Sequence, residues 1–244
     1  MALHENGISV EDAAGAARTG DIWIFRGASG ADKAIRALTN SPVNHVGMAV
    51  VLEDLPPLLW HAEMGRSLPD MWTGTRHRGV QLHDLRDAVR VWAHRYGQRA
   101  WLRQISVDVT DTQEDALLRT IARLDGTPFP STARLASRWF RGRVPRRPFR
   151  GSGGDSQSAT WESAYCAQVV AHTYEQMGLL RGARDAGWYD PGRFWSGDRL
   201  PLVPGVELGE EIAVRVTSVD PADADDEART RRGGRGDADG PAPS

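Results

Sequence analysis

The chain contains one cysteine, Cys166, and seven histidines. A thiol attacks a carbonyl carbon when an imidazole within hydrogen-bonding distance takes its proton and a third group orients that imidazole. One cysteine cannot form a disulfide within the chain, and a lone cysteine with histidines elsewhere is a known nucleophile pattern. Cys166 is therefore the first candidate for chemistry, and the alternative is a small apolar residue packed in the core.

The residues around Cys166 predict a helix that begins just before it. Ser163 can act as the N-cap, apolar residues follow Cys166 at helical spacing as far as Met177, and Gly178 ends the pattern. Cys166 would then lie in the first turn. There, unpaired backbone N–H groups and the positive helix end stabilise a thiolate and could hold an oxyanion.

His45 is the best candidate for the base. It follows an Asn-Ser-Pro break and opens an apolar run in which Gly47 permits the close approach of a backbone or substrate. His61 and Glu63 lie two residues apart on the next apolar segment, so they point to one face and either could orient His45. Glu63 is preferred because a carboxylate stabilises an imidazolium more strongly than a neutral ring does.

Four segments follow one another in a recognisable order: Gly20 to Arg26 (GDIWIFR), Ser41 to Met48 (SPVNHVGM), Ala62-Glu63, and Ala164 to Val170 (AYCAQVV). Over roughly residues 20–180 this order and spacing resembles the permuted NlpC/P60 cysteine hydrolases of the YiiX/YaeF type. The resemblance implies an α+β, circularly permuted papain-like fold, with an antiparallel sheet packed against helices and the nucleophile at a helix N-terminus. It implies Cys166 as nucleophile, His45 as base and Glu63 as the polar third member.

These residues predict an amidase- or peptidase-type cysteine hydrolase. His45 would take the thiol proton, Cys166 would attack an amide or ester carbonyl, and water would release the acyl group. This chemistry needs no cofactor and no metal, and the chain has no HExxH motif or paired cysteines. His77, His83 and His94 have no ligand spacing and are interpreted as scattered surface histidines.

Two alternatives remain open at this point. The same residues could act on a lipid ester or thioester, as a hydrolase or acyltransferase, with an anionic surface drawn to five arginines of one loop: Arg141, Arg143, Arg146, Arg147 and Arg150. Alternatively, the chain is a catalytically inert papain-like binding module with a buried, unreactive cysteine, because a fold does not guarantee an activity.

Composition narrows the partners and the compartment. The net charge is -2 and 40% of the residues are hydrophobic, which is typical of a globular protein and gives no nucleic-acid footprint. The first residues resemble no secretory signal, and no segment reaches the ~18 apolar residues of a membrane span. We expect a cytoplasmic protein without a transmembrane segment, acting on a small-molecule, peptide or lipid substrate. The oligomeric state is not predicted.

Hydrophobic periodicity predicts the elements that must position these residues. Residues 1–19 form an N-terminal helical extension, 20–219 the catalytic domain with a mobile loop at 141–160, and 220–244 a disordered tail. Strands are expected at residues 21–25, 45–52, 58–62, 79–82, 89–93 and 101–109. Helices are expected after Ser9, over 31–38, from a Thr112/Asp115 capping box to residue 124, and from Ser163 to Met177.

Overall fold

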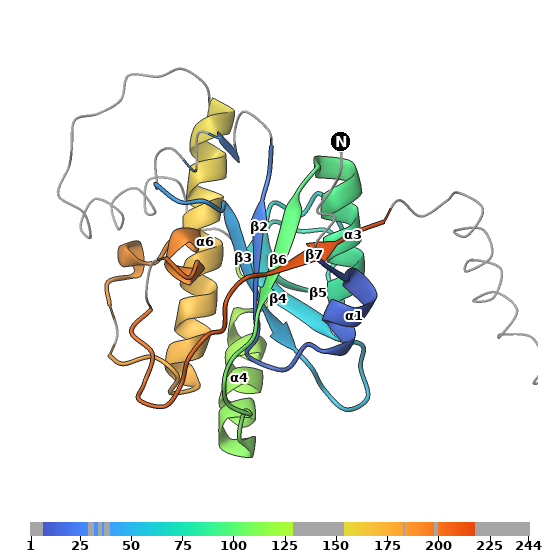
Figure 1. Cartoon of the computed structure of the whole chain (residues 1–244). Helices are drawn as coiled ribbons and strands as arrows, with labels where there is room; N and C mark the ends of the chain where they lie inside the picture. The colour runs from blue at the N-terminus through green and yellow to red at the C-terminus, as the bar shows by residue number, and fades with distance from the viewer. Residues whose placement is uncertain are drawn as a thin grey trace, which may run out of the picture.

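One seven-stranded sheet with helices on both of its faces organises the chain (Figure 1). The structure is a computed structural model, and it describes residues 7–28, 32–33, 36, 40–128, 154–182, 184–197 and 200–217. The strand order is β1-β7-β6-β2-β3-β4-β5. Strand β1 is parallel to β7, and every other neighbouring pair is antiparallel. The expected α+β class is confirmed.

The strands are short and largely buried. In chain order they are β1 Ile8–Ser9, β2 Ile22–Arg26, β3 His45–Val50, β4 Leu58–Glu63, β5 Gly79–Asp84, β6 Arg99–Arg103 and β7 Ile212–Arg215. Every residue of β3 and β4 is buried, because both faces of these central strands are covered.

Helices cover the two faces of the sheet separately (Figure 1). In the part of the chain that the structure describes, the helices include α1 Val10–Gly15, α3 Leu85–Tyr96, α4 Asp111–Leu124 and α6 Gly154–Gln176, with 3-10 turns η1 Ala186–Trp188 and η2 Pro191–Phe194. Apolar residues of α4, α6 and η2 pack in one core cluster, and those of α1 and α3 pack in a second. Alternate residues of each central strand therefore belong to different cores.

The central strands show this alternation directly. Val46 and Met48 of β3 and Trp60 of β4 belong to the α6 core, whereas Ala49 and Leu59 belong to the α3 core. Trp60 donates a hydrogen bond from Nε1 to Thr173 Oγ1 of α6 at 3.0 Å, which fixes this face of β4 against the helix.

The predicted strand at residues 89–93 is wrong, because this segment forms the middle of α3. Asp84 caps the helix by accepting from the Asp87 N–H, and Gly97 ends it in the left-handed conformation at φ 62°. The buried residues recur at helical spacing, and they are Leu85, Ala88, Val89, Trp92 and Ala93. The period of 3.6 therefore outweighs the strand propensity of the Val-containing run.

Two other helix starts differ from the expectation. Helix α4 begins two residues earlier, because Thr110 and Gln113 form the capping box instead of Thr112 and Asp115. Helix α6 begins at Gly154, nine residues before Ser163. Cys166 consequently lies in the middle of a 23-residue helix, and the expected nucleophile at a helix N-terminus is wrong in this structure.

Several expected segments fall partly outside the described residues. Residues 7–19 contribute β1 and α1, with Ser9 as the expected helix cap. Residues 154–160 of the expected loop lie in α6, whereas 141–153, with its arginines, and the expected tail at 220–244 lie outside the described residues. Of the expected helix over 31–38, residues 32, 33 and 36 are described. No helix among the described residues is long and apolar enough to cross a membrane.

Candidate functional site

A chain of three imidazoles runs across β3, β4 and β5 on the α3 side of the sheet. His45 Nε2 lies 3.1 Å from His61 Nδ1, and His61 Nε2 lies 3.1 Å from His83 Nδ1. His83 Nε2 lies 3.1 Å from Gln81 Oε1. His61 and His83 are fully buried, and His45 is 7% exposed. The imidazole chain therefore runs from the buried Gln81 amide to the His45 ring, which is slightly exposed.

The Gln81 amide sets the direction of every hydrogen bond in this chain. Gln81 Nε2 donates to the carbonyls of His77 at 3.2 Å and Gly79 at 3.4 Å, so Oε1 is the acceptor for His83. A neutral imidazole has one donor and one acceptor nitrogen. His83 therefore accepts from His61, and His61 accepts from His45.

This order leaves His45 Nδ1 as an unprotonated acceptor. Nδ1 makes no hydrogen bond to a described residue, whereas Nε2 is held by His61. An imidazole whose second nitrogen is fixed by a hydrogen bond presents its free lone pair in one direction. His45 is therefore built to accept a proton or another donor at Nδ1.

Helix α3 packs Trp92 against this chain and keeps water out. The Trp92 ring lies edge-on to His45 and to His61, with 5.0 Å between ring centroids in both cases. Burial lowers the pKa of His45 to about 3, helped by the nearby His83, and lowers the pKa of His83 to about 4. Burial also lowers the pKa of His61. The three rings are thus neutral at pH 7.

Glu63 does not orient His45 in this structure. Its Oε2 accepts from Ser67 Oγ at 2.6 Å, and its Oε1 accepts from the Ser67 N–H at 3.4 Å. Burial raises the pKa of the Glu63 carboxyl, and the Ser67 hydrogen bonds oppose this shift. His61 occupies the position at His45 that Glu63 was expected to take.

Cys166 lies on the other side of the sheet. It is fully buried in the α6 core with Val46 and Met48, whereas His45 contacts Phe25 and Trp92 of the α3 core. The 2-residue period of β3 sends His45 and Val46 to opposite faces. The structure therefore joins His45 to His61 but does not place the Cys166 thiol against the His45 ring.

Along the sheet, however, Cys166 and His45 lie at the same level. Trp60 bonds Thr173 of α6 and pairs with Met48, which is three residues along β3 from His45. Cys166 precedes Thr173 by seven residues, or ~10.5 Å of helix, and three strand residues span ~10 Å. Helix α6 and β3 lie side by side with their starts toward the same end (Figure 1). Both residues therefore lie toward the end of the sheet at which β3 begins, on opposite faces.

Sequence reasoning missed His83 and Gln81 as members of the site. His83 was interpreted as a surface residue, but it is fully buried because its position on β5 faces α3. In the sheet register, Gln81 lies directly opposite His61 and His83 lies opposite Leu59. Counting alternate residues from His61 into an antiparallel neighbour would have identified both. Among the described residues, no group of three His, Cys, Asp or Glu side chains could hold a metal ion.

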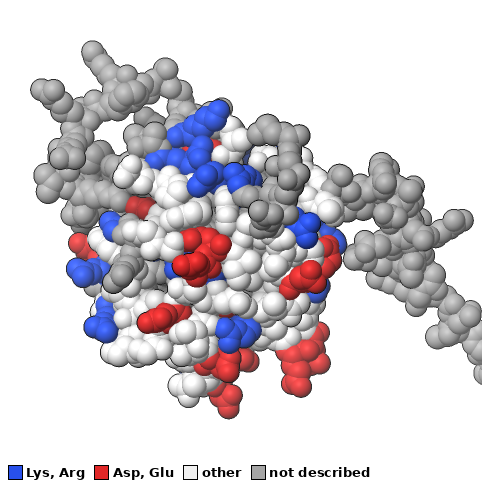
Figure 2. Space-filling view, in the orientation of Figure 1, with Lys and Arg blue, Asp and Glu red and all other residues white. Residues whose placement is uncertain are grey.

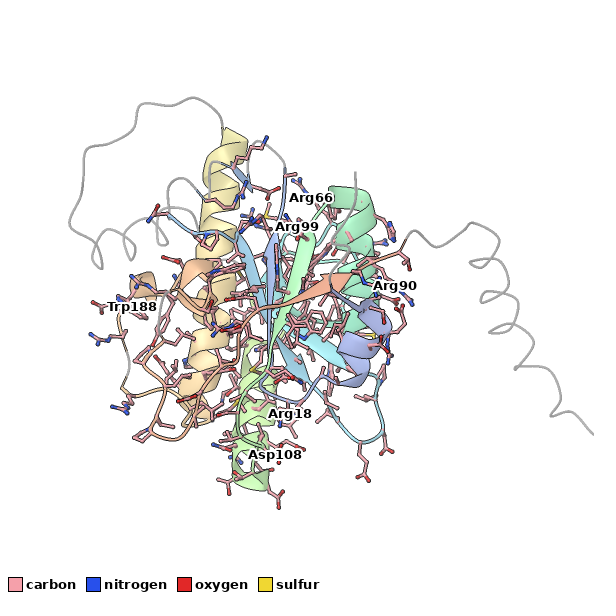
Figure 3. All side chains as sticks on the ribbon, in the orientation of Figure 1. Arg18, Arg66, Arg90, Arg99, Asp108 and Trp188 are labelled. Carbon is pink, nitrogen blue, oxygen red and sulfur yellow. The ribbon has the colours of Figure 1, made fainter. Side chains whose placement is uncertain are left out.

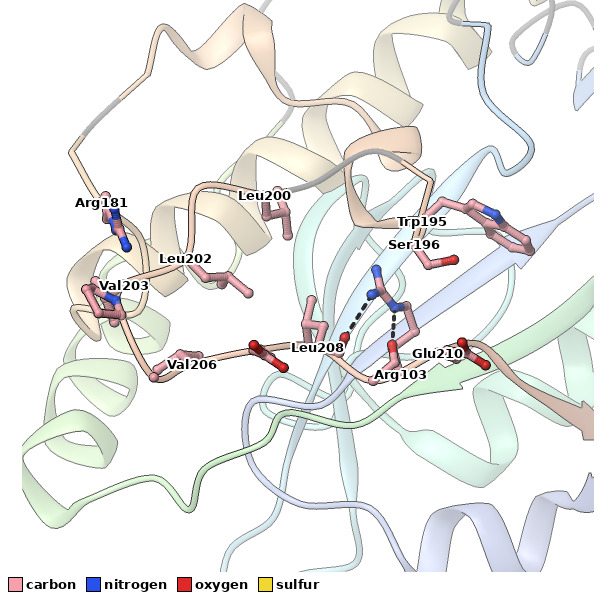
Figure 4. Close-up of a pocket in the computed structure, with 14 residues that line it drawn as sticks. Arg103, Arg181, Trp195, Ser196, Leu200, Leu202, Val203, Val206, Leu208 and Glu210 are labelled. Carbon is pink, nitrogen blue, oxygen red and sulfur yellow. Dashed lines mark hydrogen bonds between the residues drawn. The ribbon is translucent and has the colours of Figure 1, made fainter.

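A separate cavity of about 610 Å³ opens beneath the segment over residues 200–210 (Figure 4). The Arg103 guanidinium at its floor donates to the carbonyls of Gly209 at 2.7 Å, Phe194 at 2.6 Å and Leu208 at 3.1 Å. Arg103 therefore anchors this segment to the sheet. None of the imidazole-chain residues, Glu63 or Cys166 lines the cavity.

Comparisons with known proteins show structural likeness at low sequence identity. No family model and no curated protein matches the chain. Among solved structures, it is similar to the metalloprotein YiiX of Escherichia coli O157:H7, DUF1105, at 21% sequence identity. The match covers 69% of this chain and 70% of that chain, with a TM-score of 0.43. The chain thus has a YiiX structural neighbour.

Proposed function

We propose that this protein is a cysteine hydrolase with a permuted papain-like core, acting on an amide or ester. The observation that supports it best is the imidazole chain, which ends at His45 Nδ1, an acceptor that bonds to none of the described residues. The position of Cys166 toward the same end of the sheet as His45 adds to this support. The sequence pattern selects Cys166 and His45 without reference to the imidazole chain.

The proposed reaction proceeds through an acyl-enzyme. The Cys166 thiol gives its proton to His45 Nδ1 as Sγ attacks the carbonyl carbon, and His45 then passes that proton to the leaving amine or alcohol. In the second half, His45 takes a proton from water, which attacks the thioester and releases the acid. His61 holds His45 Nε2 throughout, so Nδ1 keeps its direction.

The imidazole chain favours a neutral His45 beside a protonated thiol before the substrate binds, instead of a thiolate–imidazolium ion pair. Because burial lowers the pKa of His45 to about 3, the ring is unprotonated when the substrate arrives. The thiol would therefore lose its proton during attack instead of beforehand. Acylation should persist below pH 6.5, the ordinary value for histidine, as long as the protein stays folded.

The proposal makes one structural demand. His45 is the first residue of β3, so the thiol and the imidazole must meet around the end of this strand instead of through the sheet.

Alkylation of the single cysteine tests this proposal. Native protein is treated with iodoacetamide at several pH values and followed by intact mass, using wild type, His45→Ala and the exposed-site control His94→Ala. We expect alkylation in the native state that slows in His45→Ala and is unchanged in His94→Ala. A panel of amides, esters and thioesters, including lipid esters, then identifies the acyl class.

A second candidate function is a binding module with an inert thiol. The observation that favours it is the position of Cys166, fully buried in an apolar cluster in the middle of α6 and across the sheet from His45. It is supported if iodoacetamide modifies Cys166 only after unfolding and His45→Ala changes nothing. That result would contradict the hydrolase.

A further inference from the structure

The hydrogen bonds of the imidazole chain all run in one direction. His45 Nε2 donates to His61 Nδ1 and His61 Nε2 donates to His83 Nδ1, with 3.1 Å between the nitrogens in both cases. Each donor nitrogen therefore faces an acceptor of the same kind, and two imidazoles have similar intrinsic basicity. Two successive proton transfers along the chain thus need neither a change of partner nor a stronger base at each step.

A new proton can enter this chain at His45 Nδ1. That nitrogen accepts from none of the described residues, whereas the acceptor nitrogens of His61 and His83 are each occupied by the preceding ring. A proton bound at Nδ1 makes His45 a cation. His45 can then give its Nε2 proton to His61, and His61 can give its own Nε2 proton to His83. The positive charge moves two rings while each proton moves across one hydrogen bond.

The group after His83 accepts a hydrogen bond but cannot take the proton. His83 Nε2 donates to Gln81 Oε1 at 3.1 Å, and an amide oxygen is an acceptor without being a base near neutral pH. Gln81 Nε2 is held by the carbonyls of His77 and Gly79, which keeps the amide from turning over. A positive charge that travels along the chain therefore stops at His83.

A carboxylate beside β5 favours the charge on His83. Asp70 is buried, and its Oδ1 accepts from the N–H of Leu82, the residue before His83, at 2.8 Å. Burial lowers the pKa of both end rings, to about 3 for His45 and to about 4 for His83, where the Asp70 charge opposes the shift. His77, the other titratable side chain that acts on His83 from this side, disfavours the cation when it is protonated.

The segments that cover the chain on the α3 face bring no titratable ring against it. Trp92 of α3 lies edge-on to two rings of the chain. The segment after β4 is tied to the end of α3, because the Arg66 carbonyl accepts from Arg95 Nη1 at 3.3 Å and from Tyr96 Oη at 3.4 Å. Figure 3 shows Arg66 at the upper end of α3.

The chain also runs diagonally along the sheet. In the register, His83 lies opposite Leu59, and Leu59 lies opposite Ala49, which is four residues along β3 from His45. Four strand residues span ~13 Å. Figure 2 shows Lys and Arg gathered at the upper end of the molecule, which is the end at which β3 begins (Figure 1). A charge that moves from His45 to His83 therefore moves away from that end.

We propose that His45, His61 and His83 form a proton relay, in which a proton accepted at His45 Nδ1 is followed by two transfers that place the positive charge on His83. His45 and His61 then each carry one proton, on Nδ1, and His83 carries protons on both nitrogens. The chain gains one proton in total, and the reverse transfers return the charge to His45. In the proposed reaction the Cys166 thiol supplies this proton and the leaving group takes it. That use of the relay rests on the proposed function, whereas the relay itself does not.

The protonation state of each ring nitrogen tests the relay without any need for activity. Protein labelled with ¹⁵N-histidine is followed by NMR from pH 8 to pH 4 in sucrose, which favours the folded state. At pH 8 all three rings should carry their proton on Nε2. On acidification the three rings should change together at one midpoint, because their titrations are coupled. His83 should then be protonated on both nitrogens, and His45 should carry its proton mainly on Nδ1.

Gln81→Glu should bring this titration into a range where the protein is more stable. A carboxylate at the end of the chain favours a cation on His83, so the shared midpoint should rise by about one to two pH units. The control Gln113→Glu makes the same change in the capping box of α4, where either residue fits, and should leave the midpoint unchanged. If wild type unfolds before its midpoint is reached, Gln81→Glu supplies the reading.

The relay is overturned if His45 alone becomes doubly protonated while His61 and His83 keep their pH 8 state. It is also overturned if any of the three rings carries its proton on Nδ1 at pH 8, because the hydrogen bonds would then not run in one direction. A midpoint of His45 that does not move in Gln81→Glu contradicts it as well. Cys166→Ala should titrate as wild type does, so failure of the hydrolase proposal is distinguishable from failure of this one.

Discussion

The two faces of β3 and β4 differ sharply in chemistry although they come from alternate residues of the same strands. The α3 face carries His45 and His61, which continue into a hydrogen-bonded chain of polar side chains. The α6 face carries Val46, Met48 and Trp60 in an apolar core that includes Cys166. A histidine and a cysteine suited to one reaction can therefore lie toward the same end of a sheet and still be on its opposite faces.

The largest expected effect is a loss of stability in acid, caused by the buried histidines on the α3 face. The unfolded histidines titrate near 6.5, whereas His45 and His83 titrate at about 3 and about 4 in the folded protein. Between these values the unfolded protein binds more protons than the folded protein. The free energy of unfolding is therefore greatest above pH 6.5 and falls as the pH drops below it. The slope is ~1.4 kcal/mol per pH unit for each histidine, or up to ~4 kcal/mol for His45 and His83 together at pH 5. Burial of His61 acts in the same direction.

Urea unfolding at pH 8, 6 and 5 measures this loss. His94→Gln, at an exposed position of α3, serves as the control and should keep the wild-type slope. His83→Gln should reduce the slope of the unfolding free energy against pH by the contribution of one histidine. A stability that stays level from pH 8 to pH 5 would show that the three rings are not buried as neutral groups.

Breaking the middle of the chain should have the next largest effect. His61→Leu leaves the His45 Nε2–H and the His83 Nδ1 without their partner in a buried setting. Two unsatisfied groups cost about 3 kcal/mol together, measured by urea unfolding at pH 8 where acid effects are absent. The matched variant His94→Leu should change stability by less than ~0.5 kcal/mol. Equal losses in the two variants would contradict the chain.

A substitution at Gly47 of β3 should disturb the α3 face of the sheet and leave the α6 face unchanged. A Cβ on this glycine would lie 2.7 Å from Leu59 Cδ1 and 3.3 Å from His61 Cβ, so Gly47→Ala must displace side chains on the α3 face. Overpacking of this kind costs about 2 kcal/mol. In NMR spectra, the imidazole signals of His45 and His61 should shift, whereas the Trp60 indole signal on the α6 face should not. Movement of Trp60 alone would reverse the assignment of the faces.

Cys166 should give the smallest change in stability. Cys166→Ser introduces a hydroxyl into the apolar α6 core and should cost about 1 kcal/mol more than Cys166→Ala in urea unfolding. The acid sensitivity of both variants should equal that of wild type, because the imidazole chain lies on the other face. A changed pH dependence in Cys166→Ala would place the thiol in contact with the chain.

Local patterns in the sequence were sufficient for the elements with strong signals. The Ser9 cap predicted α1, and the apolar runs predicted the strands that carry His45 and His61. The residue types at these positions also selected His45 as the candidate base. These features depend on neighbours within a few residues, which is the range over which caps and periodicity act.

The remaining features depend on contacts between distant segments. Glu63 was preferred to His61 on charge, but Ser67 takes the carboxylate and the sheet register brings His61 to His45. The buried state of His83 follows from the packing of α3 on β5, whereas the sequence pattern predicts a strand over residues 89–93 in the middle of α3. Which face α6 covers is set by tertiary contacts such as Trp60 with Thr173, which no local pattern encodes.

The formation of an acyl-enzyme on Cys166 tests the proposed function most directly. Native protein is mixed with a p-nitrophenyl ester, and intact mass is followed over time in wild type, Cys166→Ala, His45→Gln and His94→Gln. We expect one acyl group per chain in wild type and His94→Gln, none in Cys166→Ala, and an acylation rate about a hundredfold lower in His45→Gln. Native protein that stays unmodified, while the unfolded chain reacts with iodoacetamide, would contradict the hydrolase and establish an inert buried thiol.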